Sequence, residues 1–387
     1  SMSLFLLLYI TVYGTASLYA AAKLAHLSRK APPALRIAAP VLIAASLALA
    51  PIGGHMLHSA GWYRLAYPVL MAGYWGMAFV LWTVCAGLLL DAWNLGCFLS
   101  ARRRSCAVRG RLSPAAQQKI LTALIAALSV WGLVEGRQVH TRTVHLSSPK
   151  IPAAAAPVRI VHVTDCHFGL TQDGKAAARI MEAVKEAEPD LLLCTGDLFD
   201  VELRSSQIYA QLWQTVEPPL GMFAVMGNHE FYTGVPAALS LLDQCGFRTL
   251  RGTSAKPVEW LRVAGVDDPA GNHTGADSCF TDETVALRGA HAEEFIVLLK
   301  HQPRLNAELV QPVDLQLSGH THGGQIFPFH LFVRLAYPLG HGLRSNGSGG
   351  HVYVSRGAGN WGPPLRVLAP REITLFLVSS NTATADS

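Results

Sequence analysis

The chain has, at residues 319–325, the sequence Gly319-His320-Thr321-His322-Gly323-Gly324-Gln325. An apolar run precedes this stretch and predicts a strand over 313–318 that ends in a tight loop. Side chains at positions i and i+2 of an extended segment point to the same side, so His320 and His322 can face one point. The flanking glycines let the backbone turn sharply and approach a ligand closely. A histidine pair alone is a weak indication of a metal site, and its interpretation depends on the residues upstream.

Four other predicted strands end in side chains that can bind a metal. The strands lie at 158–163, 191–194, 222–226 and 295–299. The polar residues that follow them are, in chain order, Asp165 and His167, then Asp197, then Asn228, then His301. Helical patterns at 174–188, near 205–214 and near 235–245 separate the strands, which predicts a layered α/β architecture. Ligands bind outside the carboxyl ends of strands in such sheets, so we expect the five strand ends to form one site.

These five blocks resemble, in order and spacing, the motif set of the calcineurin-like metallophosphoesterases. The blocks are Asp165-x-His167, Gly196-Asp197, Gly227-Asn228-His229-Glu230, His301 and Gly319-His320-x-His322. The resemblance covers residues 158–378 and implies a four-layer αββα sandwich. The form of the histidine loop, with Ser355-Arg356-Gly357 near the end, is similar to the membrane-associated bacterial branch. That branch includes enzymes that act on lipid or lipid-like phosphoesters.

The resemblance implies two metal subsites that share one carboxylate. The first subsite would use Asp165, His167, Asp197 and His322, and the second would use Asp197, Asn228, His301 and His320. Carboxylate, amide and imidazole ligands suit Mn, Fe or Zn and do not choose among them. Two such ions roughly 3.5–4 Å apart can hold both sides of an in-line displacement and activate water between them. We therefore expect a metal-bridging hydroxide to attack phosphorus, with no protein nucleophile.

Four further residues receive a predicted role. The resemblance gives His229 contact with the phosphoryl oxygen or protonation of the leaving oxygen, and it gives Asp200 the role of orienting His229. Arg356 and Asn360 lie in a glycine-rich loop, where contact with a substrate phosphate and a plain surface position are equal alternatives.

Three residues receive a structural interpretation. We expect Glu230 to stabilise its turn and Cys166 to be a buried spectator. The pair Asp267-Asp268 is interpreted as a loop cap in preference to a third metal site.

An apolar segment at 326–337 follows the histidine loop directly. Eight of its twelve residues are Ile, Leu, Val, Phe or Tyr. One interpretation is a segment that packs in the core. The alternative is an amphipathic lip beside the metals that enters the bilayer interface or holds acyl chains.

The first third of the chain has the composition of a membrane protein. Of the 387 residues, 50% are hydrophobic and 15% are charged, against about 25% charged in soluble domains. Apolar stretches near 4–22, 35–52, 65–90 and 115–134 predict about four transmembrane helices. We therefore divide the chain into a transmembrane region at 1–146, a Pro- and Ala-rich linker at 147–157 and a catalytic domain at 158–387.

The Lys and Arg residues between these stretches predict the orientation. The loop at 23–36 carries Lys23, Arg29, Lys30 and Arg36, and the third loop carries Arg102, Arg103, Arg104, Arg109 and Arg111. The loop at 53–64 carries only Arg64. The basic loops belong in the cytoplasm, so four spans place the catalytic domain on the periplasmic side of a bacterial inner membrane. If one of the two weaker stretches, 35–52 or 115–134, does not cross the membrane, the catalytic domain lies in the cytoplasm.

The sequence thus predicts a membrane-anchored phosphoesterase that hydrolyses a phosphoester or pyrophosphate bond in a lipid or lipid-linked substrate. Two alternatives are a cytoplasm-facing pyrophosphatase for a UDP-diacylglucosamine type of substrate and a catalytically silent phosphate-binding sensor. No basic stripe with interleaved aromatics is present, which argues against a nucleic-acid partner. The sequence leaves the substrate and the oligomeric state open.

Overall fold

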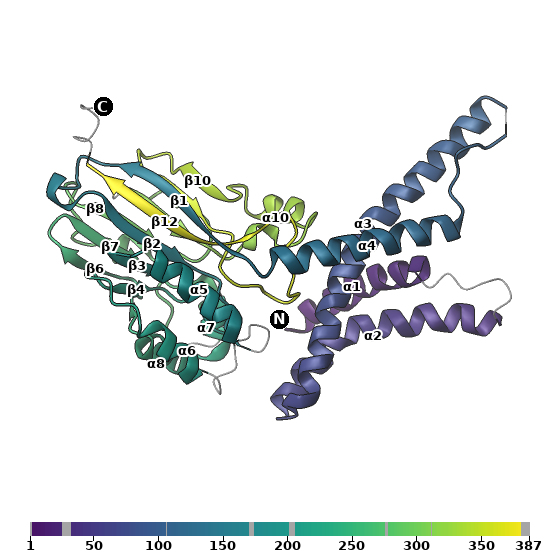
Figure 1. Ribbon diagram of the computed structural model, residues 1–387, viewed down its shortest axis with the longest axis horizontal. Helices are drawn as coiled ribbons and strands as arrows, with labels where there is room; N and C mark the ends of the chain where they lie inside the picture. The colour runs from purple at the N-terminus through teal and green to yellow at the C-terminus, as the bar shows by residue number, and fades with distance from the viewer. Residues whose placement is uncertain are drawn as a thin grey trace. The chain divides into compact units, whose positions relative to one another are not determined.

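The computed structural model describes residues 2–24, 32–105, 107–169, 174–200, 206–274, 278–310 and 312–380 (Figure 1). Arg29 and Lys30 of the first predicted basic loop lie outside the described residues. The chain divides into two compact units, one formed by 1–133 with 362–364 and the other by 134–361 with 365–387.

The first unit is helical. Its helices are α1 (Met2–Leu24), α2 (Pro33–Ser59), α3 (Tyr63–Arg103) and α4 (Pro114–Glu135), the last of which ends just past the unit boundary. Within the described residues, three helices are long and apolar enough to cross a membrane, namely α2, α3 and α4. They coincide with three of the four predicted stretches. The predicted span at 4–22 is helical as α1 but is not one of the three, so a fourth span stays a prediction.

A polar cluster joins three of these helices. The Lys23 ammonium of α1 lies 2.5 Å from Asp91 Oδ1 of α3 and donates to Gln117 Oε1 of α4 at 2.7 Å. The Tyr19 hydroxyl donates to Asp91 Oδ2 at 2.8 Å. These opposite charges and hydrogen bonds satisfy one another and connect the three helices.

The second unit contains two six-stranded mixed sheets, which confirms the predicted α/β class. The first sheet has, in spatial order, β1 (Val139–Ser147), β12 (Arg371–Ser379), β2 (Val158–Val163), β3 (Leu191–Cys194), β4 (Met222–Ala224) and β5 (Arg248–Thr249). The second has β10 (Gly342–Ser345), β11 (His351–Val354), β9 (Leu315–Ser318), β8 (Phe295–Leu299), β7 (Leu261–Gly265) and β6 (Thr253–Val258). The helices of the second unit are α5 (Gly174–Glu186), α6 (Ser206–Trp213), α7 (Asn228–Thr233), α8 (Val235–Gln244), α9 (Glu283–Ala286) and α10 (His330–Ala336).

The alternation of side chains along the strands explains the packing of this unit. Ile160 of β2 and Leu193 of β3 lie in an apolar cluster with residues of the second sheet, including Leu317. Their neighbours in sequence, such as Val161 and Leu192, point to the opposite face and pack against α5, α6 and α8. Both faces of the first sheet are therefore buried, which explains why its central strands are continuous apolar runs.

One domain boundary differs from the sequence interpretation. Residues 139–146, which we assigned to the transmembrane region, form β1 together with Ser147 of the predicted linker, and the strand pairs in parallel with β12 from Val139↔Arg371 to Ser147↔Ser379. The strand is polar and has few apolar side chains: Val144 and Leu146 pack against one core cluster and Val139 against the other, so it carries no clear strand signal. The predicted linker also contributes to the core, because Ile151 is buried.

We predict that Leu146→Asp destabilises the catalytic unit. The change places an unpaired charge against the apolar cluster and should lower the free energy of unfolding by about 2–3 kcal/mol. Thr143→Asp is the matched control, because Thr143 is exposed on the other face of the same strand, and it should cost less than about 0.5 kcal/mol. Pulse proteolysis of the full chain in urea measures both values, and equal values would contradict the packing of β1.

Candidate metal centre

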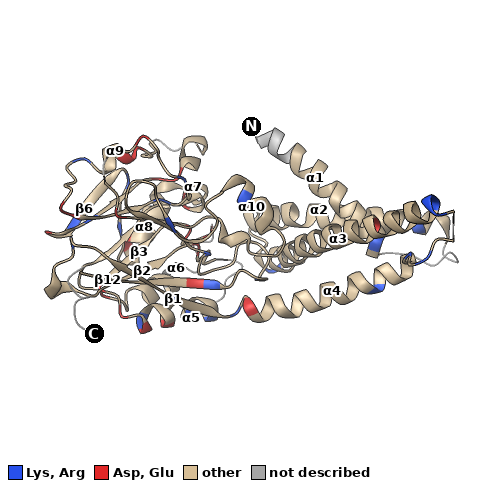
Figure 2. Cartoon of the chain, turned by 90° about the horizontal axis from the view of Figure 1, so that it is seen from above, with Lys and Arg blue, Asp and Glu red and all other residues tan. Residues whose placement is uncertain are grey.

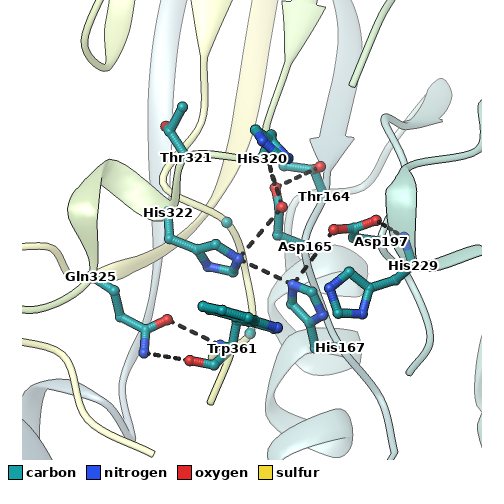
Figure 3. Close-up of polar contacts among 12 residues, drawn as sticks. Thr164, Asp165, His167, Asp197, His229, His320, Thr321, His322, Gln325 and Trp361 are labelled. Carbon is teal, nitrogen blue, oxygen red and sulfur yellow. Dashed lines mark hydrogen bonds and ion pairs between the residues drawn. The ribbon is translucent and has the colours of Figure 1, made fainter. Parts of the chain in front are cut away.

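The fold brings the predicted strand ends to one place. The strands β2, β3 and β4 run parallel to one another, as do β8 and β9, so their carboxyl ends share an edge. The loops at this edge carry all seven predicted metal ligands, and most of these are drawn in Figure 3. They are Asp165, His167, Asp197, Asn228, His301, His320 and His322. Residues from both sheets therefore contribute to one cluster.

One half of the cluster is formed by Asp165, His167, Asp197 and His322. The Nε2 atoms of His167 and His322 lie 3.1 Å apart. His322 Nε2 lies 3.6 Å from Asp165 Oδ1, and His167 Nε2 lies 3.8 Å from Asp197 Oδ2. Two imidazole nitrogens and two carboxylates thus face one small volume.

The other half also contains Asp197. His301 Nε2 lies 3.2 Å from Asp197 Oδ2 and 3.1 Å from Asn228 Oδ1. His320 Nδ1 lies 3.0 Å from Asn228 Oδ1 and 3.1 Å from His301 Nε2. The donor atoms of both halves are nitrogen and oxygen, the set that suits Mn, Fe or Zn. Because several such atoms converge on a small volume in each half, the residues present fit a bound cation in each half.

The backbone of the candidate ligands is strained. Five of them have φ values between 48° and 69°, in the left-handed region that non-glycine residues rarely adopt. They are Asp165, His167, Asp197, His320 and His322. Each such residue costs about 1 kcal/mol, and this kind of strain gathers at functional sites.

A side chain would not fit at two of the glycines in the ligand loops. A Cβ atom added at Gly319 would overlap the Asp165 carboxylate, and one added at Gly227 would overlap the Asp197 carboxylate. The two carboxylates therefore lie directly against neighbouring backbone, which explains the glycine beside each metal block.

Glu230 connects two of the ligand loops. Its buried carboxylate accepts hydrogen bonds from the backbone N–H groups of Asp197, Leu198 and Gly227, each at 2.8 Å. Burial and the nearby Asp197 charge raise the pKa of Glu230, and the backbone N–H donors oppose this. The predicted structural role of Glu230 is confirmed.

Asp200 contacts two histidines. Its Oδ1 atom lies 2.7 Å from His229 Nδ1 and 2.9 Å from His167 Nδ1. Burial opposes a charge on His229, but the carboxylates of Asp197 and Asp200 outweigh this and raise the pKa of His229 to about 9. The structure thus brings the predicted His229–Asp200 pair together and adds a contact to His167 that the sequence did not indicate.

The two predicted substrate-binding residues have internal partners. Arg356 donates to the buried Glu372 carboxylate from Nε at 2.8 Å and from Nη2 at 2.6 Å. Asn360 is buried, and its Oδ1 accepts a hydrogen bond from Arg366 Nε at 2.9 Å. Their contact with substrate therefore stays a prediction.

Arg366 was missed by the sequence analysis. It is fully buried and donates to the backbone oxygens of His322 at 3.0 Å and Arg356 at 2.8 Å. Its Nη2 atom donates to His322 Nδ1 at 3.1 Å. Burial lowers the pKa of Arg366 to about 9. It lies far from His322 in sequence, within a Gly- and Pro-rich loop that has no periodic pattern, so no local signal could have identified it.

The remaining interpretations agree with the structure. Cys166 is buried, and burial raises the pKa of its thiol well above the usual value. Asp268 Oδ1 accepts a hydrogen bond from Ala270 N at 2.8 Å and so caps the turn at Pro269–His273. Asp267 forms an ion pair with Arg251 at 2.8 Å. The loop-cap interpretation is confirmed for Asp268, whereas Asp267 serves as an ion-pair partner.

Comparison with known proteins gives the family. A family model described as calcineurin-like phosphoesterase matches residues 158–324. A metallophosphoesterase of Aquifex aeolicus is 35% identical over 234 residues, which cover 60% of this chain and 89% of the relative. A Danio rerio protein described as a transmembrane protein with metallophosphoesterase domain is 32% identical over 305 residues, 74% of this chain and 69% of the relative. A Helicobacter pylori metallophosphoesterase is 37% identical over 229 residues, 58% of this chain and 61% of the relative.

The two-sheet fold with an Asp and His cluster at its strand ends defines a metal-dependent hydrolase of phosphoric esters. The chain belongs to the calcineurin-like phosphoesterase family, whose members use a dinuclear metal centre.

We predict that Glu230→Gln weakens both the fold and the metal centre. The amide can accept on one side only and turns an N–H group toward backbone donors, so the free energy of unfolding should fall by about 3 kcal/mol. Bound metal should fall below the wild-type amount, because the loops that carry Asp197 and Asn228 separate. Urea unfolding and elemental analysis measure the two effects. Glu259→Gln is the control, since its side chain is 95% exposed, and it should change neither quantity.

Proposed function

We propose that the protein is a membrane-anchored dinuclear phosphoesterase that hydrolyses a phosphoester or pyrophosphate bond in a lipid or lipid-linked substrate. The observation that carries the proposal is Asp197, whose carboxylate belongs to both donor groups. A shared carboxylate holds two cations close together, which is the arrangement that in-line phosphoryl chemistry uses.

The ligand assignment follows the two halves of the cluster. One ion would be held by Asp165, His167, Asp197 and His322, and the other by Asp197, Asn228, His301 and His320. When bound, the two ions supply Lewis-acid stabilisation of the phosphoryl oxygens and activate water for attack. Asp200 stabilises this set because its contact with His167 Nδ1 fixes the ring that presents Nε2 to the cluster.

His229 supplies the proton in this proposal. Asp200 holds its Nδ1 atom at 2.7 Å, so the Nε2 atom remains to face the substrate. The Asp200 carboxylate beside Nδ1 favours the protonated imidazole, which suits a donor to the phosphoryl or leaving oxygen. The backbone N–H of His229 donates to Asp197 Oδ1 at 2.9 Å and thereby fixes its position relative to the shared carboxylate.

Three features support membrane anchoring and an extracytoplasmic site. Three helices are long and apolar enough to span a membrane, and the Danio rerio relative is described as a transmembrane protein. The Arg-rich segment 102–111 covers the end of α3 and part of the connection to α4. If it stays in the cytoplasm, the crossing of α4 puts the catalytic unit outside, whether or not α1 spans. This favours a multi-pass protein of the bacterial inner membrane with a periplasmic catalytic domain.

The two alternative functions require different structural features. A cytoplasm-facing pyrophosphatase with a UDP-diacylglucosamine type of substrate requires that α4 does not cross. A silent sensor requires that the centre lacks a donor or the proton-donating histidine, and the chain has all seven donors and His229. The hydrolase with an outside site is therefore the proposal that the residues favour.

We predict that Asp197→Ala and His229→Ala separate metal binding from catalysis. Asp197→Ala should lose bound metal and all turnover of p-nitrophenyl phosphate and bis-p-nitrophenyl phosphate. His229→Ala should keep both metals but lose about 10²–10⁴-fold in rate, because only the proton donor is removed. Elemental analysis and steady-state assays of the detergent-purified chain measure both.

Exposed residues provide the matched controls for these variants. Asp243→Ala and His273→Ala should keep wild-type metal content and rate, since both side chains lie on the surface. A wild-type chain without bound metal, or an Asp197→Ala variant with full activity, would contradict the proposed function.

We predict that the C-terminus lies outside the cytoplasm. A C-terminal alkaline phosphatase fusion in a bacterial host should be active and a green fluorescent protein fusion dark. Deletion of residues 2–24 should leave both signals unchanged, because the orientation depends on the Arg-rich segment and α4. The reverse signals in the full chain would favour the cytoplasm-facing pyrophosphatase.

A further inference from the structure

The helix that follows the histidine loop is exposed. All seven residues of α10 are described, and none is buried. Leu331 is 55% exposed, Phe332 54% and Leu335 83%, and the preceding Phe329 is 47% exposed. The core-packing interpretation therefore holds for Ile326, which is buried, but not for α10, whose large apolar surface remains to be explained.

This surface borders the metal centre. Gly324 of the histidine loop lies against His330, because an added Cβ would overlap the backbone of His330 at the start of α10. At the other end of α10, the Tyr337 ring lies 5.3 Å from the ring of the candidate ligand His320. A segment docked on α10 would thus lie next to the reacting phosphate.

A second loop extends the same surface. Gln325 donates to the Trp361 carbonyl at 2.9 Å and accepts from the Trp361 N–H at 3.0 Å, as Figure 3 shows. The Trp361 ring is 50% exposed and lies 6.4 Å from the His229 ring. Ile326 and Val367 form a parallel bridge, which brings the exposed Leu368 beside this segment. We call the set of exposed side chains the apolar rim, and it comprises Phe329, Leu331, Phe332, Leu335, Trp361 and Leu368.

The stretch of sequence that carries the apolar rim contains basic residues and no acidic one. The sequence contains no Asp or Glu between Asp314 and Glu372. Arg334 on α10 and Arg344 on β10 are exposed within this stretch. In Figure 2, α10 carries a basic residue and no acidic one. An apolar surface on an Arg-containing, acid-free stretch of chain matches the interface of an anionic bilayer, where aromatic and aliphatic side chains enter the acyl boundary and Arg binds headgroups.

We propose that the apolar rim rests in the headgroup region of an anionic bilayer and presents the metal centre to the phosphate of a lipid. The inference deepens the proposed function and rests on it for the identity of the substrate as a lipid. The bilayer is the favoured occupant because the same chain carries three helices suited to a membrane. A second copy of the chain is a poorer partner, since its rim would oppose Arg334 with another Arg334.

The test is photo-crosslinking in the full chain. The crosslinking amino acid p-benzoyl-phenylalanine replaces Leu335, and the protein is reconstituted in phosphatidylcholine vesicles with about one third phosphatidylglycerol. Irradiation should give a lipid adduct detectable by mass spectrometry. The control position is Val310, which is 93% exposed and precedes β9, at the opposite end of that strand from His320. The adduct at position 335 should exceed that at 310 by at least about fivefold.

Two further variants define the surface. Phe329→Ser with Phe332→Ser should lower the adduct at position 335 by at least about fivefold, whereas the matched exposed pair Ile208→Ser with Val285→Ser should not change it. Arg334→Gln with Arg344→Gln should remove the preference for vesicles that contain phosphatidylglycerol.

The crosslinking results test the membrane contact of the apolar rim separately from the proposed hydrolase function. The adduct forms without turnover, so it should persist in an Asp197→Ala background even if the protein hydrolyses no lipid. Absence of a lipid adduct at position 335, while p-nitrophenyl ester turnover is intact, would contradict the contact of the apolar rim with the bilayer. It would not contradict the proposed hydrolase activity. A crosslink to a second copy in place of lipid would also contradict the contact of the apolar rim with the bilayer.

Discussion

The position of the Asp197 carboxylate is the constraint on which the site depends. Its Oδ2 atom faces His301 and His167, and its Oδ1 atom accepts the backbone N–H of His229. The backbone of Asp197 is in turn held by Glu230, which reaches across from the next strand end. One carboxylate thus sets the separation of the two donor groups, the place of the proton donor and the approach of the β3 and β4 loops.

This arrangement is intrinsically unfavourable and needs a stable frame. Five left-handed ligand residues cost several kcal/mol together, on the order of 1 kcal/mol each. The frame is the apolar cluster between the two sheets, in which residues such as Leu193, Val297 and Leu317 are fully buried. The strands are apolar on both faces, so their ends can carry strained and polar loops without loss of the fold.

The sequence predicted what is local and periodic. Each ligand follows its strand within a few residues, and apolar runs and turn glycines mark the strands, so the cluster could be inferred from pattern. The sequence could not reveal Arg366 or the contact of Asp200 with His167, because these interactions join residues far apart in the chain. It also missed β1, whose polar residues pair with β12 at the far end of the chain. A strand of this kind is stabilised by its partner, and its own composition gives little signal.

The pairing of β1 with β12 has a consequence for biosynthesis. Val139 emerges early, but its partner Arg371 is made more than about two hundred residues later, which at ~5–20 residues per second means a wait of roughly 10–40 s. During that time the strand that follows α4 has an unpaired edge. Its Thr, His and Arg side chains keep this edge soluble, since exposed apolar edges invite association with other chains. The polar composition that hides β1 from sequence analysis therefore suits a nascent chain that closes its first sheet last.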